Sequence, residues 1–526
     1  MISKPQQALL AALQNACQSK QWTQVEQILA EFQKPANHFL AGFARGYARV
    51  QQGQWQVAQA ELKLAIQQGV FPLEARRNLV LALIKSGQNT EAQAVLEQIL
   101  QQAPWNLNGL QQLINIQLIT GQHQALQATA SSILQAGFES GLKQYAPQML
   151  PFLLDWQPQL AAVLLLDQFA IRADTVSLRL SVQNWWQSYL KHRRPLSPNY
   201  AYLQRERADA PLRIGYVSRE WLQAPMELGF ANLFAYHDLE QFQLFAYSDA
   251  GAVNYPQFHK VSDSSGWNDY QFYQAVQADQ IDILVDLSGF FNPKRLLSLA
   301  LKPAPIQILA GSNPPFAAFT DCFEAVLSHD VLIPAERQRD MPEQILDQGC
   351  FFYWQAPRVS PDVTSLPLLQ GGAPSLGILA SPNKINADTI QLWAEVLKAL
   401  PDARLCFKNQ LYADPLLQAR YRQDFARHGI TGERLHFEDH QTSSDLFTFL
   451  QDIDLVLDSF PYTGALSTCD AWWMGVPVIS LSGGHLIADS IAATLNDHAF
   501  LAKDPEHYVK LVKALCDRIR DQMPTR

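Results

Sequence analysis

The sequence predicts an α plus α/β protein in which an N-terminal array of helical repeats is followed by two doubly wound, Rossmann-like α/β lobes. Three observations predict this architecture. Glycines recur at a fixed interval near the N-terminus, apolar segments alternate with amphipathic helices after Pro211, and a Gly/Pro-rich break at 366–375 divides that second region in two. Because a chain of 526 residues exceeds what one hydrophobic core usually supports, several domains are expected.

The repeats are defined by their spacing. Gly53, Gly87 and Gly121 lie 34 residues apart, and Ala58 and Ala92 keep the same interval. A 34-residue period with glycine at the turn between two helices and alanine in the second helix is the tetratricopeptide signature. One helix pair cannot bury its apolar face alone, so neighbouring pairs stack and leave a concave surface of the kind that holds peptides.

After the repeats, the pattern becomes that of parallel sheets covered on both faces, in which continuous apolar strands alternate with helices. The predicted strands are LRIGYVS, FQLFAYS and IDILVDLSG in the first lobe, and LGILAS, ARLCFKN, IDLVLDSF and VPVISLSG in the second. The predicted domains are a tetratricopeptide-like array at 1–137, a helical linker region at 138–210, an N-lobe at 211–365 and a C-lobe at 366–526. A nucleotide-type site is expected at the facing strand ends of the two lobes.

The composition excludes several classes of protein. There are 40 Lys and Arg residues against 49 Asp and Glu, and the resulting formal net charge of −9 argues against a nucleic-acid partner. The 6 cysteines form no C-x-x-C pair, so neither a zinc site nor a disulfide framework is expected. The first segment lacks the apolar core of a signal peptide and no apolar run is long enough to span a membrane, so a cytoplasmic protein without a membrane partner is expected.

A candidate ligand site follows the strand IDLVLDSF. A small-residue loop around Gly464 leads into Ser467 and Thr468, which are good N-cap residues for the next helix. Free N–H groups at a helix N-terminus bind anions, so a diphosphate there needs no metal. Asp470 could accept hydrogen bonds from ribose hydroxyls or be an acid placed favourably on the helix dipole. Lys384, after another strand, could neutralise phosphate charge or be an ordinary exposed lysine.

Several segments, in this order along the chain, resemble the tetratricopeptide-linked O-GlcNAc-transferase-like glycosyltransferases, a family with a two-lobed GT-B catalytic fold. These segments are PLRIGYVS, IDILVDLSG, KPAPIQIL, NKINADTIQLWAEVLKALPDARL and DIDLVLDSFPYTGALSTCDAWWMGVPVISL. The likeness extends from Leu212 to about Pro505. It implies an N-lobe on the acceptor side and a C-lobe on the nucleotide-sugar side. It also implies inverting transfer of a sugar from a nucleotide-linked donor onto protein side chains, without a metal or any further cofactor.

The resemblance also assigns residues. The donor-binding residues that it implies are Lys384, Gly464, Ser467, Thr468, Asp470 and Arg295. Lys384 would face the donor phosphates, the helix opened by Ser467 and Thr468 would cradle the diphosphate, and Asp470 would hold the ribose. Arg295 matches an arginine of the first lobe near the cleft. A protein acceptor would dock on the repeats, and a homodimer is a candidate assembly because such arrays often dimerise.

The chain departs from the family pattern at four places, each of which replaces a polar group. Ala224–Pro225 stands for His-Pro, Phe290–Phe291 for His or Tyr followed by Thr, Gly464–Ser467 for Gly-His-Thr-Thr, and Leu446 for a histidine near the nucleotide base. One interpretation is a changed donor, such as a CMP-linked nonulosonic acid transferred to flagellin instead of a UDP-linked sugar. The other is a degenerate relative that acts as a protein-binding scaffold.

An inverting transferase needs a base to take the proton of the acceptor. Glu220 and Glu227, in and after the loop that follows the first strand, are the candidates. Glu227 opens the next helix and could equally be a first-turn acid on the helix dipole.

Overall fold

The computed structural model describes residues 2–104, 106–135, 165, 175–190, 200, 210–219, 221, 233–251, 253–289, 292–310, 320–328, 344–347, 354, 356–357, 360–438, 443–482 and 500–522. Contacts divide the chain into two compact units. The first contains Met1–Leu126, Asn409–Arg427 and Phe437–Asp439, and the second contains Gln127–Lys408, His428–His436 and His440–Arg526.

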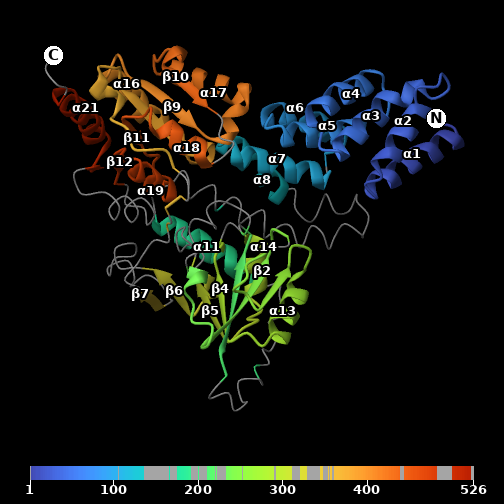
Figure 1. Ribbon diagram of the computed structural model, residues 1–526, viewed down its shortest axis with the longest axis horizontal. Coiled ribbons are helices and arrows are strands. Elements are labelled where there is room, and N and C mark those ends of the chain that lie inside the picture. Colours follow the sequence, from blue (N-terminus) through green and yellow to red (C-terminus); the bar gives the residue numbers. More distant parts are fainter. Residues whose placement is uncertain are drawn as a thin grey trace. The chain divides into compact units, whose positions relative to one another are not determined.

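Successive helices form the array, drawn in dark blue to cyan in Figure 1, and the first unit contains this array as far as Leu126. They are α1 (Lys4–Gln18), α2 (Trp22–Glu31), α3 (Ala41–Gln51), α4 (Trp55–Gln67), α5 (Pro72–Lys85), α6 (Asn89–Gln102), α7 (Leu107–Ile119) and α8 (His123–Gln135). Gly53, Gly87 and Gly121 lie at the turns between the helices of the last three pairs, with φ of 73°, 76° and 67°. This left-handed conformation favours glycine and explains the 34-residue signal.

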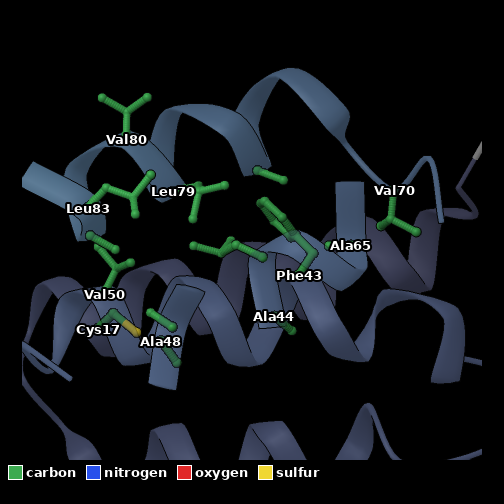
Figure 2. Packing of buried hydrophobic residues seen from close by; sticks show 14 of the residues in the cluster. Cys17, Phe43, Ala44, Ala48, Val50, Ala65, Val70, Leu79, Val80 and Leu83 are labelled. Carbon is green, nitrogen blue, oxygen red and sulfur yellow. The ribbon is translucent and has the colours of Figure 1, made fainter. Parts of the chain in front are cut away.

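The core of the array is made by small and aliphatic side chains from neighbouring pairs. Ala58 and Ala92, the repeated alanines, are both fully buried. Figure 2 shows how Phe43 and Leu79 point into the same core from different helices. Burying these faces between neighbours is what the repeat pattern predicts.

A second repeated contact links the helix pairs. Gln59 Nε2 donates to Gln88 Oε1 at 2.7 Å, and 34 residues further on Gln122 Nε2 donates to Gln93 Oε1, also at 2.7 Å. The first unit also includes α17 (Pro415–Arg427), next to which Asp414 Oδ2 accepts a hydrogen bond from the N–H of Thr90 at 2.7 Å. These partly buried amides pair across repeats and so help to fix the register of the stack.

The N-lobe in the second unit is a seven-stranded parallel sheet with strand order β3-β2-β1-β4-β5-β6-β7 (Figure 1). The strands are β1 (Leu212–Ser218), β2 (Phe242–Ser248), β3 (Lys260–Asp263), β4 (Ile283–Asp286), β5 (Ile306–Leu309), β6 (Ala325–Ser328) and β7 (Gln344–Asp347). The helices are α11 (Thr175–Leu190), α13 (Asp269–Ala278) and α14 (Pro293–Leu299). Alternate residues of β2 belong to different core clusters, Phe245 and Tyr247 to one and Leu244 and Ala246 to the other, so both faces of the sheet are covered.

The C-lobe is a six-stranded sheet with order β10-β9-β8-β11-β12-β13. Its strands are β8 (Ser375–Ile378), β9 (Arg404–Lys408), β10 (Leu435–Glu438), β11 (Leu455–Leu457), β12 (Val478–Leu481) and β13 (Leu501–Ala502). Its helices in the second unit are α16 (Ala387–Ala399), α18 (Ser443–Leu450), α19 (Leu466–Trp473) and α21 (Pro505–Asp521). The pairs β8/β9, β8/β11, β11/β12 and β12/β13 are parallel.

The predicted fold class is confirmed: a helical array precedes two parallel α/β lobes, and each of the seven predicted strand segments contains a strand. The predicted linker at 138–210 falls mainly outside the described residues, and α11 is the helix described within it. Across the described ranges, no helix has both the length and the apolar character needed to cross a membrane.

Candidate functional site

The two C-lobe segments singled out from the sequence meet at one point of the sheet. The chain runs from β8 outward to β9 and β10, and then returns to place β11 and β12 on the other side of β8. The carboxyl ends of β8 and β11 therefore flank the topological switch point, where open α/β sheets bind ligands. Lys384 follows β8, and the loop from Asp458 to Ala465 follows β11.

Asp458 folds this loop back onto its own strand. Its side chain is 7% exposed, and Oδ1 accepts hydrogen bonds from the N–H of Gly464 at 2.7 Å and of Ser459 at 2.9 Å. Oδ2 accepts a third from Ser480 Oγ at 2.8 Å. Burial raises the pKa of Asp458, and these hydrogen bonds and the charge of Lys384 oppose the rise. The N–H of Gly464 is thus already engaged within the protein.

The N-terminus of α16 holds the same loop from another side. Asn386 Nδ2 and Thr389 Oγ1 both donate to the carbonyl of Phe460, at 2.8 and 2.7 Å. The Asn386 side chain also caps α16 by accepting from the N–H of Thr389 at 2.9 Å. Within the loop, Ser459 Oγ donates to the carbonyl of Tyr462 at 2.6 Å. A loop fixed at several points needs little rearrangement to bind a ligand.

Lys384 projects into this loop. Nζ donates to the carbonyl of Thr463 at 3.1 Å and lies 4.1 Å from the centroid of the Tyr462 ring, a cation–π distance. Burial lowers the pKa of Lys384 to about 8, and the charge of Asp458 acts in the opposite direction. An ammonium group has three donor hydrogens, so the bond to Thr463 leaves capacity for an anion. That this anion is a donor phosphate stays a prediction.

The start of α19 differs from the prediction. The helix begins at Leu466, its N-cap residue is Ala465, and no side chain caps it, so the prediction that Ser467 and Thr468 are cap residues is wrong. Both lie in the first turn, and their hydroxyls crowd Gly464. A Cβ atom on Gly464 would lie 3.0 Å from Ser467 Oγ and 2.9 Å from Thr468 Oγ1. The glycine therefore lets two hydroxyls gather where the first N–H groups of the helix lack intrahelical acceptors.

One buried hydroxyl in this loop has an unmet hydrogen-bonding capacity. Thr463 Oγ1 is fully buried and has no hydrogen-bond partner among the described residues. A buried polar atom without a partner is costly, so such an atom often marks the place of a ligand or an ordered water. Together with the ammonium of Lys384 and the start of α19, it makes this loop suited to an anion with several oxygens.

Asp470 lies beyond the first turn of α19, which disfavours the interpretation of an acid placed on the helix dipole, and it is 6% exposed. Oδ1 accepts a hydrogen bond from Trp354 Nε1 at 3.0 Å. Burial raises the pKa of Asp470 to about 6, against the lowering effect of this hydrogen bond. Its binding of a ribose stays a prediction.

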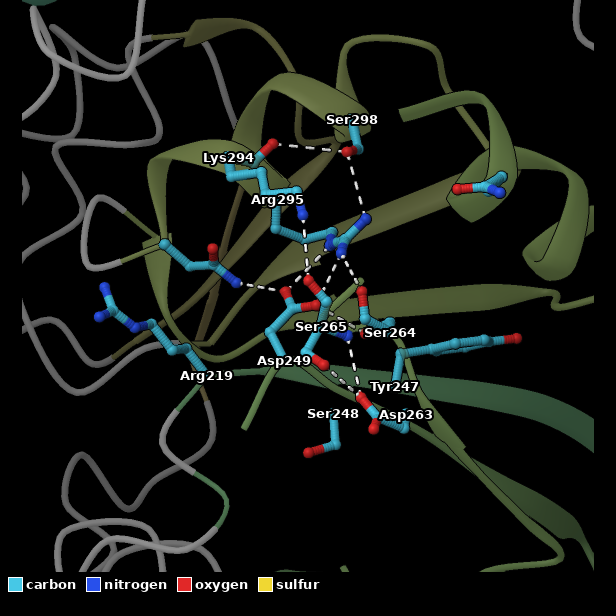
Figure 3. A network of polar contacts seen from close by, with 12 residues as sticks. Arg219, Tyr247, Ser248, Asp249, Asp263, Ser264, Ser265, Lys294, Arg295 and Ser298 are labelled. Carbon is cyan, nitrogen blue, oxygen red and sulfur yellow. Dashed lines mark hydrogen bonds and ion pairs between the residues drawn. The ribbon is translucent and has the colours of Figure 1, made fainter. Parts of the chain in front are cut away.

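Arg295 has a different environment from the one its implied role requires. The side chain is 0% exposed, and Nη2 and Nε donate to the two carboxylate oxygens of Asp249 at 2.6 and 3.0 Å (Figure 3). Nη2 also donates to the carbonyl of Ser264 at 3.0 Å, and the guanidinium lies 4.1 Å from the centroid of the Phe272 ring. Arg295 thus fastens α14 to the ends of β2 and β3, and no atom of it is exposed to meet a donor.

The N-lobe switch point, between β1 and β4, carries a polar cluster that the sequence did not single out. Ser218 Oγ and Ser288 Oγ lie 3.2 Å apart, and Asp286 accepts from the N–H groups of Ser288 at 3.0 Å and Gly289 at 3.1 Å. The candidate bases Glu220 and Glu227 lie outside the described residues, so their role stays a prediction. The departures from the family pattern at 224–225 and 290–291 also lie outside the described residues.

A helical repeat array followed by two doubly wound lobes, each with its own topological switch point, defines a GT-B protein joined to a repeat array. Residues 191–347 match the model of glycosyl transferase family 41. The chain is 26% identical over 324 residues to the probable UDP-N-acetylglucosamine–peptide N-acetylglucosaminyltransferase SPINDLY of Arabidopsis thaliana. The aligned region covers 58% of this chain and 35% of that protein. The chain is 24% identical over 295 residues to the probable transferase SEC of the same plant, covering 53% and 30%.

The chain spans about a third of the length of the curated relatives that it matches. Among solved structures, it is similar to a mutant of the Thermobaculum terrenum O-GlcNAc transferase, with a TM-score of 0.61 and 21% identity. That likeness covers 99% of this chain and 93% of the other, and it shows the fold. These comparisons confirm the predicted resemblance: the chain is similar to the O-GlcNAc-transferase-like glycosyltransferases.

Proposed function

We propose that this chain is an inverting, metal-independent glycosyltransferase that moves a sugar from a nucleotide-sugar donor onto a protein acceptor docked by the helical repeats. The observation that carries the proposal is the meeting of Lys384 with the loop after β11, where Nζ lies 3.1 Å from the carbonyl oxygen of Thr463. A cation is thus in contact with the loop that leads into the start of α19.

The chemistry of the transfer needs these groups. An acceptor hydroxyl attacks the anomeric carbon, a base takes its proton, and the bond to the nucleotide phosphate breaks. Negative charge then grows on the leaving phosphate, and fixed donors aimed at that charge stabilise the transition state. Lys384 and the first turn of α19 would supply this stabilisation, and Glu227 or Glu220 would be the base.

The names of the curated relatives favour a UDP-linked donor, since they describe enzymes that use UDP-N-acetylglucosamine. The alternative donor is a CMP-linked nonulosonic acid, with flagellin as the acceptor. It rests on the polar groups that this chain lacks relative to the family, one of which is replaced by the half-buried Leu446 in α18.

Incorporation of labelled sugar into protein tests the proposal. The full chain is incubated, in the presence of a chelator, with labelled UDP-N-acetylglucosamine or a labelled CMP-linked nonulosonic acid, and with a Ser/Thr peptide library or flagellin as acceptor. Transfer from the UDP-linked sugar is expected. Transfer from the CMP-linked sugar alone would identify that sugar as the donor in place of the UDP-linked one. No transfer from either sugar, together with retained partner binding, would favour a protein-binding scaffold without catalytic activity.

Substituting Gly464 tests the loop itself. In Gly464→Ala, the new Cβ would meet the hydroxyls of Ser467 and Thr468 at 3.0 and 2.9 Å and Asp458 Oδ1 at 3.4 Å. We expect a loss of stability of about 1–3 kcal/mol from overpacking. We also expect the affinity for UDP, measured by calorimetry, to fall by about tenfold or more because the two hydroxyls are displaced.

The matched control is Gly266→Ala. Among the described residues, no atom beyond Gly266 and its two neighbours in the sequence lies within 4 Å of the Cβ that this substitution would add. Its thermal midpoint and its affinity for UDP should equal those of the wild type. An unchanged affinity in Gly464→Ala would mean that the loop does not hold the nucleotide.

A further inference from the structure

The indole N–H of Trp354 donates a hydrogen bond to one oxygen of the Asp470 carboxylate, which is predicted to bind the ribose. Trp354 Nε1 donates to Asp470 Oδ1 at 3.0 Å, and the two indoles of Trp354 and Trp473 lie with ring centroids 5.5 Å apart. A carboxylate can accept about four hydrogen bonds, so this contact leaves Oδ2 with its capacity. An indole N–H can only donate, so it pairs best with the ionised form of the carboxyl group.

The chain that follows Trp354 is attached to the C-lobe near α19. Trp473 Nε1 donates to Ser360 Oγ at 3.1 Å, and Gln451 Nε2 donates to the carbonyl of Asp362 at 2.9 Å. A Cβ on Gly475, just after α19, would lie 3.3 Å from Val363 Cγ1. The described residues of the connection between the two sheets thus contact α19 and its surroundings at several points, of which the Trp354 contact is one.

We propose that Trp354 is a positioning residue of the donor site, whose indole N–H fixes the Asp470 carboxylate so that Oδ2 is presented to the ribose hydroxyls of the nucleotide. This inference rests on the proposed glycosyltransferase function. It adds a residue from the connection between the lobes to the nucleotide site, and it makes ribonucleotides the preferred class over nucleotides that lack ribose hydroxyls.

The charge on Asp470 supports the same role. Burial raises the pKa of Asp470 to about 6, and the hydrogen bond from Trp354 opposes this rise. Without the bond, the carboxyl group would keep its proton to a higher pH, and a neutral carboxyl makes weaker hydrogen bonds to hydroxyls. The neighbouring thiol of Cys469 stays neutral, because burial and the charge of Asp470 raise its pKa to about 12.

Trp354→Phe, which keeps an aromatic ring and removes the donor, tests the proposal in the full chain. We expect the dissociation constant of UDP at pH 7 to rise about tenfold, as for the loss of a hydrogen bond to a charged group. The loss of affinity at acidic pH should begin at a higher pH in the variant than in the wild type. The ionisation of UDP itself is common to both proteins and cancels in the comparison.

A nucleotide without ribose hydroxyls separates positioning from a general structural effect. Trp354→Phe should leave the affinity for 2′,3′-dideoxy-UDP nearly unchanged, and Trp473→Phe, the matched control, should leave both affinities and the pH profile unchanged. An equal loss for UDP and dideoxy-UDP, an unshifted pH profile, or tighter binding of UDP would each overturn the proposal. Tighter binding would instead show that Trp354 obstructs the carboxylate.

A second variant keeps the test decisive should Trp354→Phe fail to fold. Asp470→Ala removes both carboxylate oxygens and should abolish the preference for UDP over dideoxy-UDP, and a retained preference would contradict the role of Oδ2. Wild-type protein that binds no nucleotide would refute the proposed function itself. Wild-type protein that binds UDP, combined with a Trp354→Phe variant that behaves identically, would refute this inference alone.

Discussion

Replacing Lys384 with methionine is expected to lower the rate of sugar transfer by roughly 10²–10³-fold, the usual loss when one fixed donor to a developing charge is removed. Methionine keeps much of the length of the half-buried side chain but removes the ammonium group. The loop after β11 should persist, because its anchors Asp458, Asn386 and Thr389 are unchanged. The measurement is the single-turnover rate with saturating donor, together with circular dichroism to verify the fold.

The pH dependence of kcat/KM in the wild type tests the role of the Lys384 ammonium group independently. Burial lowers the pKa of Lys384 to about 8. Its charge is therefore present below that pH and is lost as the pH rises through it. We expect kcat/KM, which reports on the free enzyme, to decline above about pH 8. Lys384→Arg, which stays charged, should not show this decline, and Lys384→Met with wild-type kcat/KM would disprove the role of the lysine.

Removal of the Arg295 guanidinium is expected to have the largest effect on stability. In Arg295→Ala, the Asp249 carboxylate would remain buried without the cation that it now contacts at 2.6 and 3.0 Å. Breaking one side of a buried ion pair typically costs about 3–5 kcal/mol. Burial alone would raise the pKa of Asp249, and Arg295, Ser264 and Asn292 together hold it below its ordinary value. The loss should appear as a lower thermal midpoint in calorimetry.

Lys398→Ala is the control for this prediction, because it breaks an ion pair with Glu395 in which both side chains are exposed to solvent. Such pairs contribute about 0–1 kcal/mol, so the thermal midpoint should hardly move. Arg295→Lys, studied where it is folded, should bind UDP as the wild type does. A selective loss of UDP affinity in that variant would restore Arg295 to the donor site and contradict its structural role.

Local and periodic signals allowed the fold to be predicted from the sequence. Gly53, Gly87 and Gly121 recur because the turns need a backbone conformation that favours glycine. The N-lobe strands are continuously apolar because both faces of their sheet are buried. The face of α16 that carries Ile390, Trp393 and Leu397 is buried as its helical spacing implies. These features depend on neighbouring residues, so the sequence displays them directly.

The site was only partly predictable, because several of its contacts join residues distant in the sequence. Trp354 and Asp470 are 116 positions apart, and nothing in their local patterns links them. No sequence pattern singles out Asp458, although it fixes the loop through hydrogen bonds from Gly464 and Ser480. The buried ion pair of Arg295 was not predictable for a similar reason, since its partner Asp249 lies 46 positions away in the sequence.

Calorimetric titration of the full chain with UDP, CMP and GDP, in the presence of a chelator, tests most directly whether the C-lobe loop holds a nucleotide. We expect UDP to bind, and we expect its affinity to fall clearly in Lys384→Met because the cation beside the loop is gone. A preference for CMP would support a nucleotide site at this loop but indicate a CMP-linked donor in place of a UDP-linked one. Absence of binding by all three nucleotides, or UDP binding that Lys384→Met and Gly464→Ala leave unchanged, would contradict a nucleotide site at this loop.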